Sequence, residues 1–121
     1  MLARRGDIFY AGLDFLDGVN SEGISPILIL DNQMGSRYKP TVICAVIAQM
    51  KEPLPRLPVH IKITDEKCPL AEAAVISIDV IHTIDKKRIR EKICRLDNET
   101  MAKVEDALKI MLCLNDTTVG V

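Results

Sequence analysis

The chain has 121 residues, which is enough for one domain with a hydrophobic core and too few for two. Its formal net charge of −1 gives no general support to a nucleic-acid or membrane surface, although it allows local charged patches. Aromatic residues make up 3% of the sequence, which argues against an aromatic platform for stacking bases. No apolar run approaches the roughly 18 residues of a membrane span. The N-terminal residues lack the apolar core of a signal peptide, so we expect a cytoplasmic protein with no membrane partner.

In chain order, the sequence first predicts β-strands. A Gly-Asp turn opens residues 5–13 and leads into a segment of β-forming residues. Residues 14–23 are rich in glycine, aspartate, asparagine and serine, and we expect them to form a mobile loop. A second strand is expected over residues 26–31, because a short run of aliphatic residues follows Pro26.

The middle of the chain predicts three more strands. Residues 41–50 are apolar almost throughout, which predicts a strand buried on both faces. Three prolines within residues 53–58 exclude a helix or a central strand there. Clean alternation predicts a strand over residues 59–63, and residues 74–84 predict another buried strand. The basic residues 85–95 are expected to connect this strand to a helix.

The last predicted element is a helix over residues 97–114. Asp97 is the expected N-cap, and Leu96 is expected to pack against Met101 as a hydrophobic staple. A core-facing apolar stripe is formed by Met101, Val104, Leu108, Met111 and Leu112. A run of strands closed by one helix in so short a chain predicts a small, strongly curved barrel or half-barrel.

Four cysteines, Cys44, Cys68, Cys94 and Cys113, are spread along the chain. No pair has CxxC spacing, and no histidine lies within motif distance of one of them, so the sequence predicts no metal site. A disulfide framework is not expected either. Cys44 and Cys113 lie inside apolar runs and are predicted to be small core residues.

Common catalytic motifs are missing: the sequence contains no GxGxxG, P-loop, HExxH or GxSxG, and no cofactor is expected. The two histidines, His60 and His82, could act together as acid and base in phosphodiester cleavage. Two basic clusters could hold phosphates or could form solvated charged faces. These clusters are Arg37 with Lys39, and Lys86, Lys87, Arg88 and Arg90.

Five phrases carry a family resemblance. They are RRGDIFYAGL (4–13), PILILDNQMGSRYKPTVICAVIAQ (26–49), LPVHIKI (57–63), IHTIDKKRI (81–89) and DNETMAKVEDALKIMLCL (97–114). In order and spacing, the chain resembles the MazF/PemK family of toxin endoribonucleases from toxin–antitoxin pairs. The resemblance implies one domain over residues 1–121 that is mainly β with a C-terminal α-helix, a small SH3-like barrel of the plasmid-maintenance-toxin type. It also implies a homodimer whose groove binds single-stranded RNA or the disordered tail of a MazE-like antitoxin.

The resemblance also implies a metal-independent, sequence-specific and ribosome-independent cleavage of single-stranded mRNA. In the family, the RNA 2′-hydroxyl attacks the adjacent phosphate and gives a 2′,3′-cyclic phosphate and a free 5′-hydroxyl. An arginine in a G-x-R-P phrase stabilises the phosphate, and a threonine late in the third strand assists it. Here Ser25 stands at the arginine position and Ala48 at the threonine position; a one-residue gap there would remove the threonine altogether.

Further groove positions differ from the family pattern. Asp79 and Val80 stand where the family tends to have a Glu-Gln pair, and His82 replaces an arginine. The RNA-binding candidates are Asn20, Ser21, Glu22, Arg37, Lys39, Asp79, His82 and Arg88.

Three hypotheses follow. The first is an active or weakly active MazF-like ribonuclease that uses a relocated cation, with cleavage that depends on Arg37, Arg88 or His82. The second is a catalytically inactive dimeric module that binds RNA, a MazE-like antitoxin or a related toxin subunit. The third is an acid–base enzyme that uses His60 and His82 on another substrate.

Overall fold

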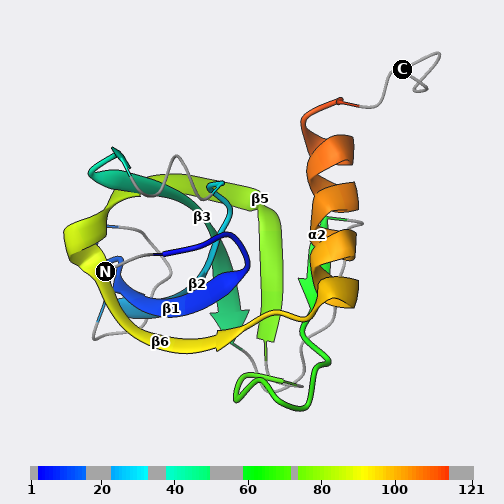
Figure 1. The fold of residues 1–121 in the computed structure, drawn as a ribbon, viewed down its shortest axis with the longest axis horizontal. Coiled ribbons are helices and arrows are strands. Elements are labelled where there is room, and N and C mark those ends of the chain that lie inside the picture. Colours follow the sequence, from blue (N-terminus) through cyan, green and yellow to red (C-terminus); the bar gives the residue numbers. More distant parts are fainter. Residues whose placement is uncertain (1–2, 16–22, 33–37, 50–58, 72–73, 115–121) are drawn as a thin grey trace.

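The computed structural model describes residues 3–15, 23–32, 38–49, 59–71 and 74–114. Within these residues the strands form one antiparallel sheet in the order β4-β5-β3-β2-β1-β6, which curls into an open barrel with a C-terminal helix beside it (Figure 1). The elements are β1 (Asp7–Gly12), β2 (Ile24–Ile29), β3 (Thr41–Gln49), β4 (His60–Lys62), β5 (Ala74–Asp85), the 3₁₀ helix η1 (Lys86–Arg88), β6 (Ile89–Arg95) and α2 (Asn98–Met111). The predicted fold class is confirmed, although the sheet does not close: β4 and β6 are its two edges.

Side chains from both faces of the sheet are buried, in two separate clusters. Ile8 and Phe9 are neighbours in β1, yet each belongs to a different cluster, because successive side chains of a strand point to opposite faces. The same alternation separates Cys44 from Ala45 in β3. This double burial explains the almost continuous apolar runs in the sequence, and it confirms the prediction for β3.

The structure corrects the prediction for the basic segment. Residues 85–95 were expected as a connection, but most of them form β6, which pairs antiparallel with β1. Only Ile89 is fully buried in β6, and most of its remaining side chains are charged. Charged residues are common on an edge strand because they discourage pairing with another sheet. Such a strand carries too weak an apolar pattern to be recognised in the sequence.

Two other predicted strands have different limits or burial. The second strand begins at Ile24 and ends at Ile29, in place of the predicted residues 26–31, so it includes Ser25. The fifth is mostly buried in its first part, Asp79 and Val80 at its middle are exposed, and among residues 79–85 only Ile84 is buried.

The helix α2 packs on the sheet through a narrower stripe than expected. Val104 and Ala107 are buried, and Met101, Leu108 and Met111 are partly buried against the same cluster, which also contains Leu96. Leu112 is 53% exposed, so its place in the predicted stripe is wrong.

At the start of the helix, Asp97 occupies the N-cap position, but its side chain makes no capping hydrogen bond. Cys113 is exposed, and not in the core as predicted, because the helix has ended at Met111 and the backbone has turned to a positive φ of 56°.

No helix in the described part of the chain is long and apolar enough to span a membrane.

A buried carboxylate fixes β6 against β1. Asp7 is 1% exposed and accepts hydrogen bonds from the Arg4 backbone N–H at 3.0 Å and from the Arg95 guanidinium at 2.9 Å. The Lys92 ammonium lies 3.3 Å from the same carboxylate. Burial by itself would raise the pKa of Asp7, but these three donors outweigh it and hold the pKa below its usual range.

We predict that Asp7→Asn lowers the unfolding free energy by about 1–3 kcal/mol at pH 7, because charge-assisted hydrogen bonds to a buried acceptor are lost. Because the pKa of Asp7 is lowered by folding, its contribution is complete above the unfolded value of about 3.9 and is lost as the pH falls through the folded value. Urea unfolding should therefore show a constant difference between the two proteins from pH 7 to about pH 5 and a shrinking difference below about pH 4.

The matched control is Asp14→Asn, since the Asp14 side chain is 76% exposed and its ion pair should contribute little. If Asp7→Asn lowered the unfolding free energy by the same amount at pH 3 and at pH 7, the role assigned to the Asp7 charge would be contradicted.

Candidate functional site

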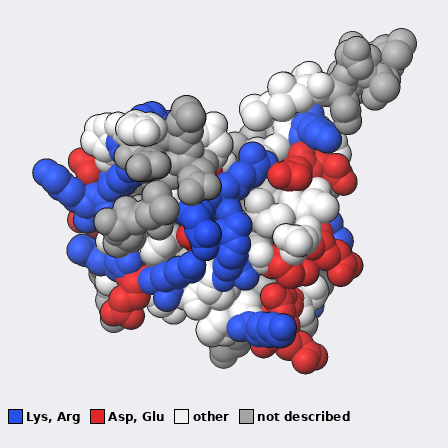
Figure 2. All heavy atoms as spheres, viewed as in Figure 1, with Lys and Arg blue, Asp and Glu red and all other residues white. Residues whose placement is uncertain are grey.

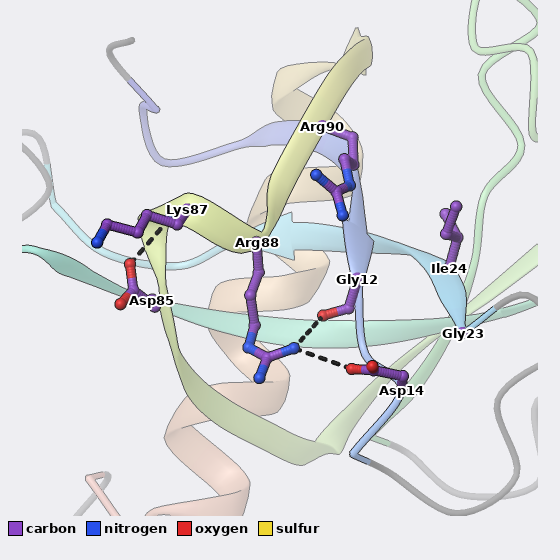
Figure 3. Close-up of a pocket in the computed structure, with 8 residues that line it drawn as sticks. All are labelled: Gly12, Asp14, Gly23, Ile24, Asp85, Lys87, Arg88 and Arg90. Atoms are coloured by element: carbon purple, nitrogen blue, oxygen red, sulfur yellow. Dashed lines mark hydrogen bonds and ion pairs between the residues drawn. The ribbon is translucent and has the colours of Figure 1, made fainter.

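A pocket of about 390 Å³ opens where β1, β2 and the start of β6 meet (Figure 3). Its lining residues are Gly12, Asp14, Gly23, Ile24, Asp85, Lys87, Arg88 and Arg90. Three of them are basic and two are acidic, and the basic ones come from η1 and β6. Residues 85–90 lie more than 60 residues beyond residues 12–24 in the sequence, so the sheet order creates the site.

Arg88 is held in this pocket by contacts to β1 and to the residues that follow it. Its Nη1 donates to the Gly12 carbonyl at 3.2 Å and to Asp14 Oδ1 at 3.0 Å (Figure 3). Its guanidinium carbon also lies 4.5 Å from the centre of the Phe15 ring, in a cation–π arrangement. The side chain is nevertheless 40% exposed, so a ligand in the pocket can reach a guanidinium that is already oriented.

Gly23 lets the chain enter β2 close to β1. Its φ of +70° belongs to the left-handed region, and a Cβ at this position would lie 2.7 Å from the Asp14 Cβ. Its carbonyl accepts a hydrogen bond from the Leu13 N–H at 2.6 Å. The wall of the pocket therefore depends on a residue without a side chain.

Ser25 and Ala48 are brought together by the sheet. Ile27 pairs with Val46, and continuing this antiparallel register by two residues places Ser25 opposite Ala48. The Ser25 hydroxyl lies 3.3 Å from the Ile47 carbonyl and 3.4 Å from the Pro26 carbonyl, so its one proton is directed at backbone acceptors. The pocket begins one residue pair away, where Gly12 pairs with Ile24.

The remaining sequence candidates are dispersed. Lys39 forms an ion pair with the buried Asp31 at 3.4 Å, which also accepts a hydrogen bond from the Ile43 N–H. Asp79 on β5 contacts His60 of β4 at 3.1 Å. The RNA-binding candidates Asn20, Ser21, Glu22 and Arg37 lie outside the described residues, as does most of the predicted mobile loop 14–23.

The two histidines do not form one site within the chain. His60 pairs with Ser77, whereas His82 lies five residues further along β5, opposite Cys44. At about 3.3 Å per residue this corresponds to roughly 16 Å. The hypothesis of a joint acid–base pair within one subunit is therefore wrong.

Sequence reasoning missed the partners of Arg88. Phe15 and the Gly12 carbonyl orient the guanidinium, and neither is recognisable as functional in the sequence. The only signal was an aromatic residue, 51% exposed in the structure, at the start of an otherwise polar segment. No group of three or more metal-ligating side chains is found among the described residues.

Comparison with known proteins defines the family. Residues 4–112 match the family described as PemK-like, MazF-like toxin of type II toxin–antitoxin system. The chain belongs to this family of endoribonuclease toxins. It is also 38% identical to Endoribonuclease EndoA of Bacillus subtilis (strain 168) over 117 residues, which cover 96% of this chain and 99% of that protein. The resemblance predicted from the sequence phrases is confirmed.

Solved MazF structures have the same fold. An endoribonuclease from Mycobacterial species in complex with its cognate antitoxin matches with a TM-score of 0.76 at 20% identity, over 93% of this chain and 97% of that one. A MazE–MazF structure from Deinococcus radiodurans matches with a TM-score of 0.72 at 13% identity, over 93% and 96%. Because the sequence identities are so low, these matches support the fold alone, which is an open barrel with a C-terminal helix.

We predict that Gly23→Ala lowers the unfolding free energy by about 1–3 kcal/mol, because alanine is strained at this φ and its Cβ would collide with Asp14. Gly12→Ala is the control: its Cβ would meet Arg90 at 3.6 Å, an ordinary contact, and should cost less than about 1 kcal/mol. Urea unfolding of the two variants measures the difference. Equal losses would show that neither the backbone conformation nor the close approach at Gly23 matters.

Proposed function

We propose that this protein is a cytoplasmic, homodimeric MazF/PemK-type toxin-family protein that binds single-stranded RNA in the pocket beside Ser25, with endoribonuclease activity that is weak or lost. The observation that carries this proposal is the contrast between two neighbouring parts of the site. The basic pocket holds an oriented Arg88, whereas the adjacent strand pair presents Ser25 and Ala48, neither of which carries a charge.

RNA binding is supported by the placement of charge. In Figure 2, Lys and Arg side chains gather on the barrel side of the viewed face, and acidic side chains lie mostly along the side of α2. This asymmetry gives a chain of net charge −1 a local surface suited to phosphates. Arg88 suits a phosphate especially, because a guanidinium is a permanent charge with a planar fork of donors.

Weak or absent cleavage is supported by the chemistry of the two strand residues. In the MazF/PemK pattern, an arginine at the position of Ser25 stabilises charge that develops on the phosphate. A serine hydroxyl provides one donor and no charge, and here that donor lies against the Ile47 carbonyl. Loss of one preorganised charge stabiliser typically lowers the rate by about 10²–10³, and Ala48 supplies no polar group to compensate.

Partners are proposed by analogy with the solved relatives. Structures from Mycobacterial species and from Deinococcus radiodurans contain the toxin together with its antitoxin. We therefore propose a MazE-like antitoxin as a partner of this chain. The basic pocket would accept carboxylates of an antitoxin tail through the same donors that bind phosphate.

Cleavage is tested with the purified protein and a long unstructured RNA in excess chelator, with RNA ends mapped by primer extension. The unmodified protein should give no cuts or weak cuts, and Ser25→Arg/Ala48→Thr should raise cleavage by at least about 10². Ser25→Lys/Ala48→Thr is the matched control, because lysine restores a charge without the bidentate fork.

Strong, discrete cuts by the unmodified protein would contradict the loss of activity. Arg88 and His82 would then be the residues to replace. No cuts by either protein, together with retained RNA binding, would support the alternative of a dimeric binding module that acts on RNA, an antitoxin or a related toxin subunit. Failure of both proteins to bind RNA would overturn the proposed function.

RNA binding itself should depend on Arg88. We predict that Arg88→Ala raises the Kd for single-stranded RNA by about 3–10-fold and lowers the salt slope of log K by about 1, because one phosphate contact is lost. Arg5→Ala is the control, since Arg5 is paired with Glu105 of α2 at 3.0 Å and should not affect binding. Fluorescence anisotropy over a range of salt concentrations measures both quantities, and equal affinities of Arg88→Ala and the unmodified protein would contradict the assignment.

A further inference from the structure

Two cysteines that are remote in the sequence meet outside the pocket. Cys68 lies in the turn that follows β4, and Cys94 lies near the end of β6. Their sulfur atoms are 2.7 Å apart, which is roughly 0.7 Å longer than a disulfide bond. Both are free thiols in this structure.

This contact spans the open seam of the sheet. β4 and β6 are the two edges of the strand order, and they are the elements that a closed barrel would have to join. Cys68 follows one edge strand and Cys94 belongs to the other, so their contact links the two sides of the seam. The backbone around Cys68 is fixed by a hydrogen bond from its N–H to the Asp65 carbonyl at 3.0 Å and by another from the Ala71 N–H to the Cys68 carbonyl at 3.0 Å.

The surroundings give the two thiols different access. Cys68 is 3% exposed and belongs to the core cluster that also includes Leu70 and Leu96. Cys94 is only half-buried and packs against the same cluster from β6. A reagent from solvent therefore reaches Cys94 first, and Cys68 is the thiol positioned behind it.

We propose that Cys68 and Cys94 form an oxidisable dithiol site that takes low-molecular-weight disulfides as its oxidant and closes the seam of the barrel covalently. The Cys94 thiolate attacks a sulfur of the disulfide RSSR, which forms a mixed disulfide and releases RS⁻. The Cys68 thiolate then attacks the Cys94 sulfur, which forms the Cys68–Cys94 bond and releases a second RS⁻. The two thiol protons end on the two RS⁻ groups, so both cysteines are oxidised while RSSR is reduced to two RSH.

The site should react slowly near neutral pH. Burial is the main factor that raises the pKa of Cys94 to about 12, the Cys68 thiol and the Asp65 carboxylate raise it further, and Lys92 opposes them. Because the thiolate is the nucleophile, the oxidation rate should increase as the pH rises. A thiol reductant should reverse the reaction, as expected for a disulfide in a reducing compartment.

The test is to incubate the full chain with excess oxidised glutathione at pH 8.5 and to count free thiols, measure the intact mass and map the linked peptides. Because the exposed Cys113 also forms a mixed disulfide with glutathione, we expect free thiols to fall from four to one, with a glutathione adduct on Cys113 and one peptide pair that joins Cys68 to Cys94 with loss of two hydrogen atoms. The oxidised protein should unfold roughly 10 °C higher, because the bond constrains the unfolded chain. Added thiol reductant should return the number of free thiols and the unfolding temperature to their starting values.

Matched variants assign the reaction to this pair. Cys113→Ala removes an exposed thiol outside the site and should leave the link and the shift in Tm unchanged, whereas Cys94→Ala should abolish both. The peptide map of the unmodified protein keeps the test decisive if Cys94→Ala folds poorly. Cys68 and Cys94 both free after prolonged incubation, a bond between either of them and Cys113, or an intermolecular dimer in place of the internal link would each overturn the proposal.

Discussion

The antiparallel pairing of β6 with β1 is the constraint on which the candidate site depends. β6 carries few buried side chains, so its attachment depends on polar contacts as much as on apolar burial. Asp7, buried at the start of β1, binds Arg95 and Lys92 near the far end of β6. This anchor fixes the register of an edge strand that would otherwise be free to slip. Because that register is fixed, Arg88 of η1 lies beside the end of β1, where it donates a hydrogen bond to the Gly12 carbonyl.

In this MazF/PemK-type toxin, the residues that build the fold are distinct from those that we propose to carry the chemistry. Gly23 and the paired strands β2 and β3 are needed to build the sheet whatever residues stand at 25 and 48. Small side chains at these two positions fit the strand pair, and the serine hydroxyl finds an acceptor in the backbone of β3. The fold and the basic pocket can therefore persist while the proposed catalytic function declines, because no buried charge is left unpaired by the change.

Much of the fold could be predicted from the sequence, since the buried strands carry long apolar runs and the C-terminal helix has regular spacing. Ser25 and Ala48 could be located through family phrases, but their facing arrangement needed the register of the sheet. β6 could not be recognised, because an edge strand with charged side chains has little period-two apolar signal. Cys113 was misplaced for a related reason: local hydrophobicity does not reveal that the helix has already ended at Met111. The Gly12 carbonyl could not be recognised as a partner of Arg88, because a backbone carbonyl carries no sequence signal, and Phe15 could be paired with Arg88 only through the sheet order.

The most direct test of the central claim, RNA bound in the pocket without efficient cleavage, is a titration of isotope-labelled protein with a single-stranded RNA followed by NMR. Backbone amide signals report the binding surface, and the RNA is examined for intact length afterwards. We expect chemical-shift changes centred on Gly12, Ile24 and Arg88, with much smaller changes along the outer face of α2, and RNA that remains essentially uncut. Rapid cleavage of the RNA, or shift changes that spare the pocket, would contradict the central claim.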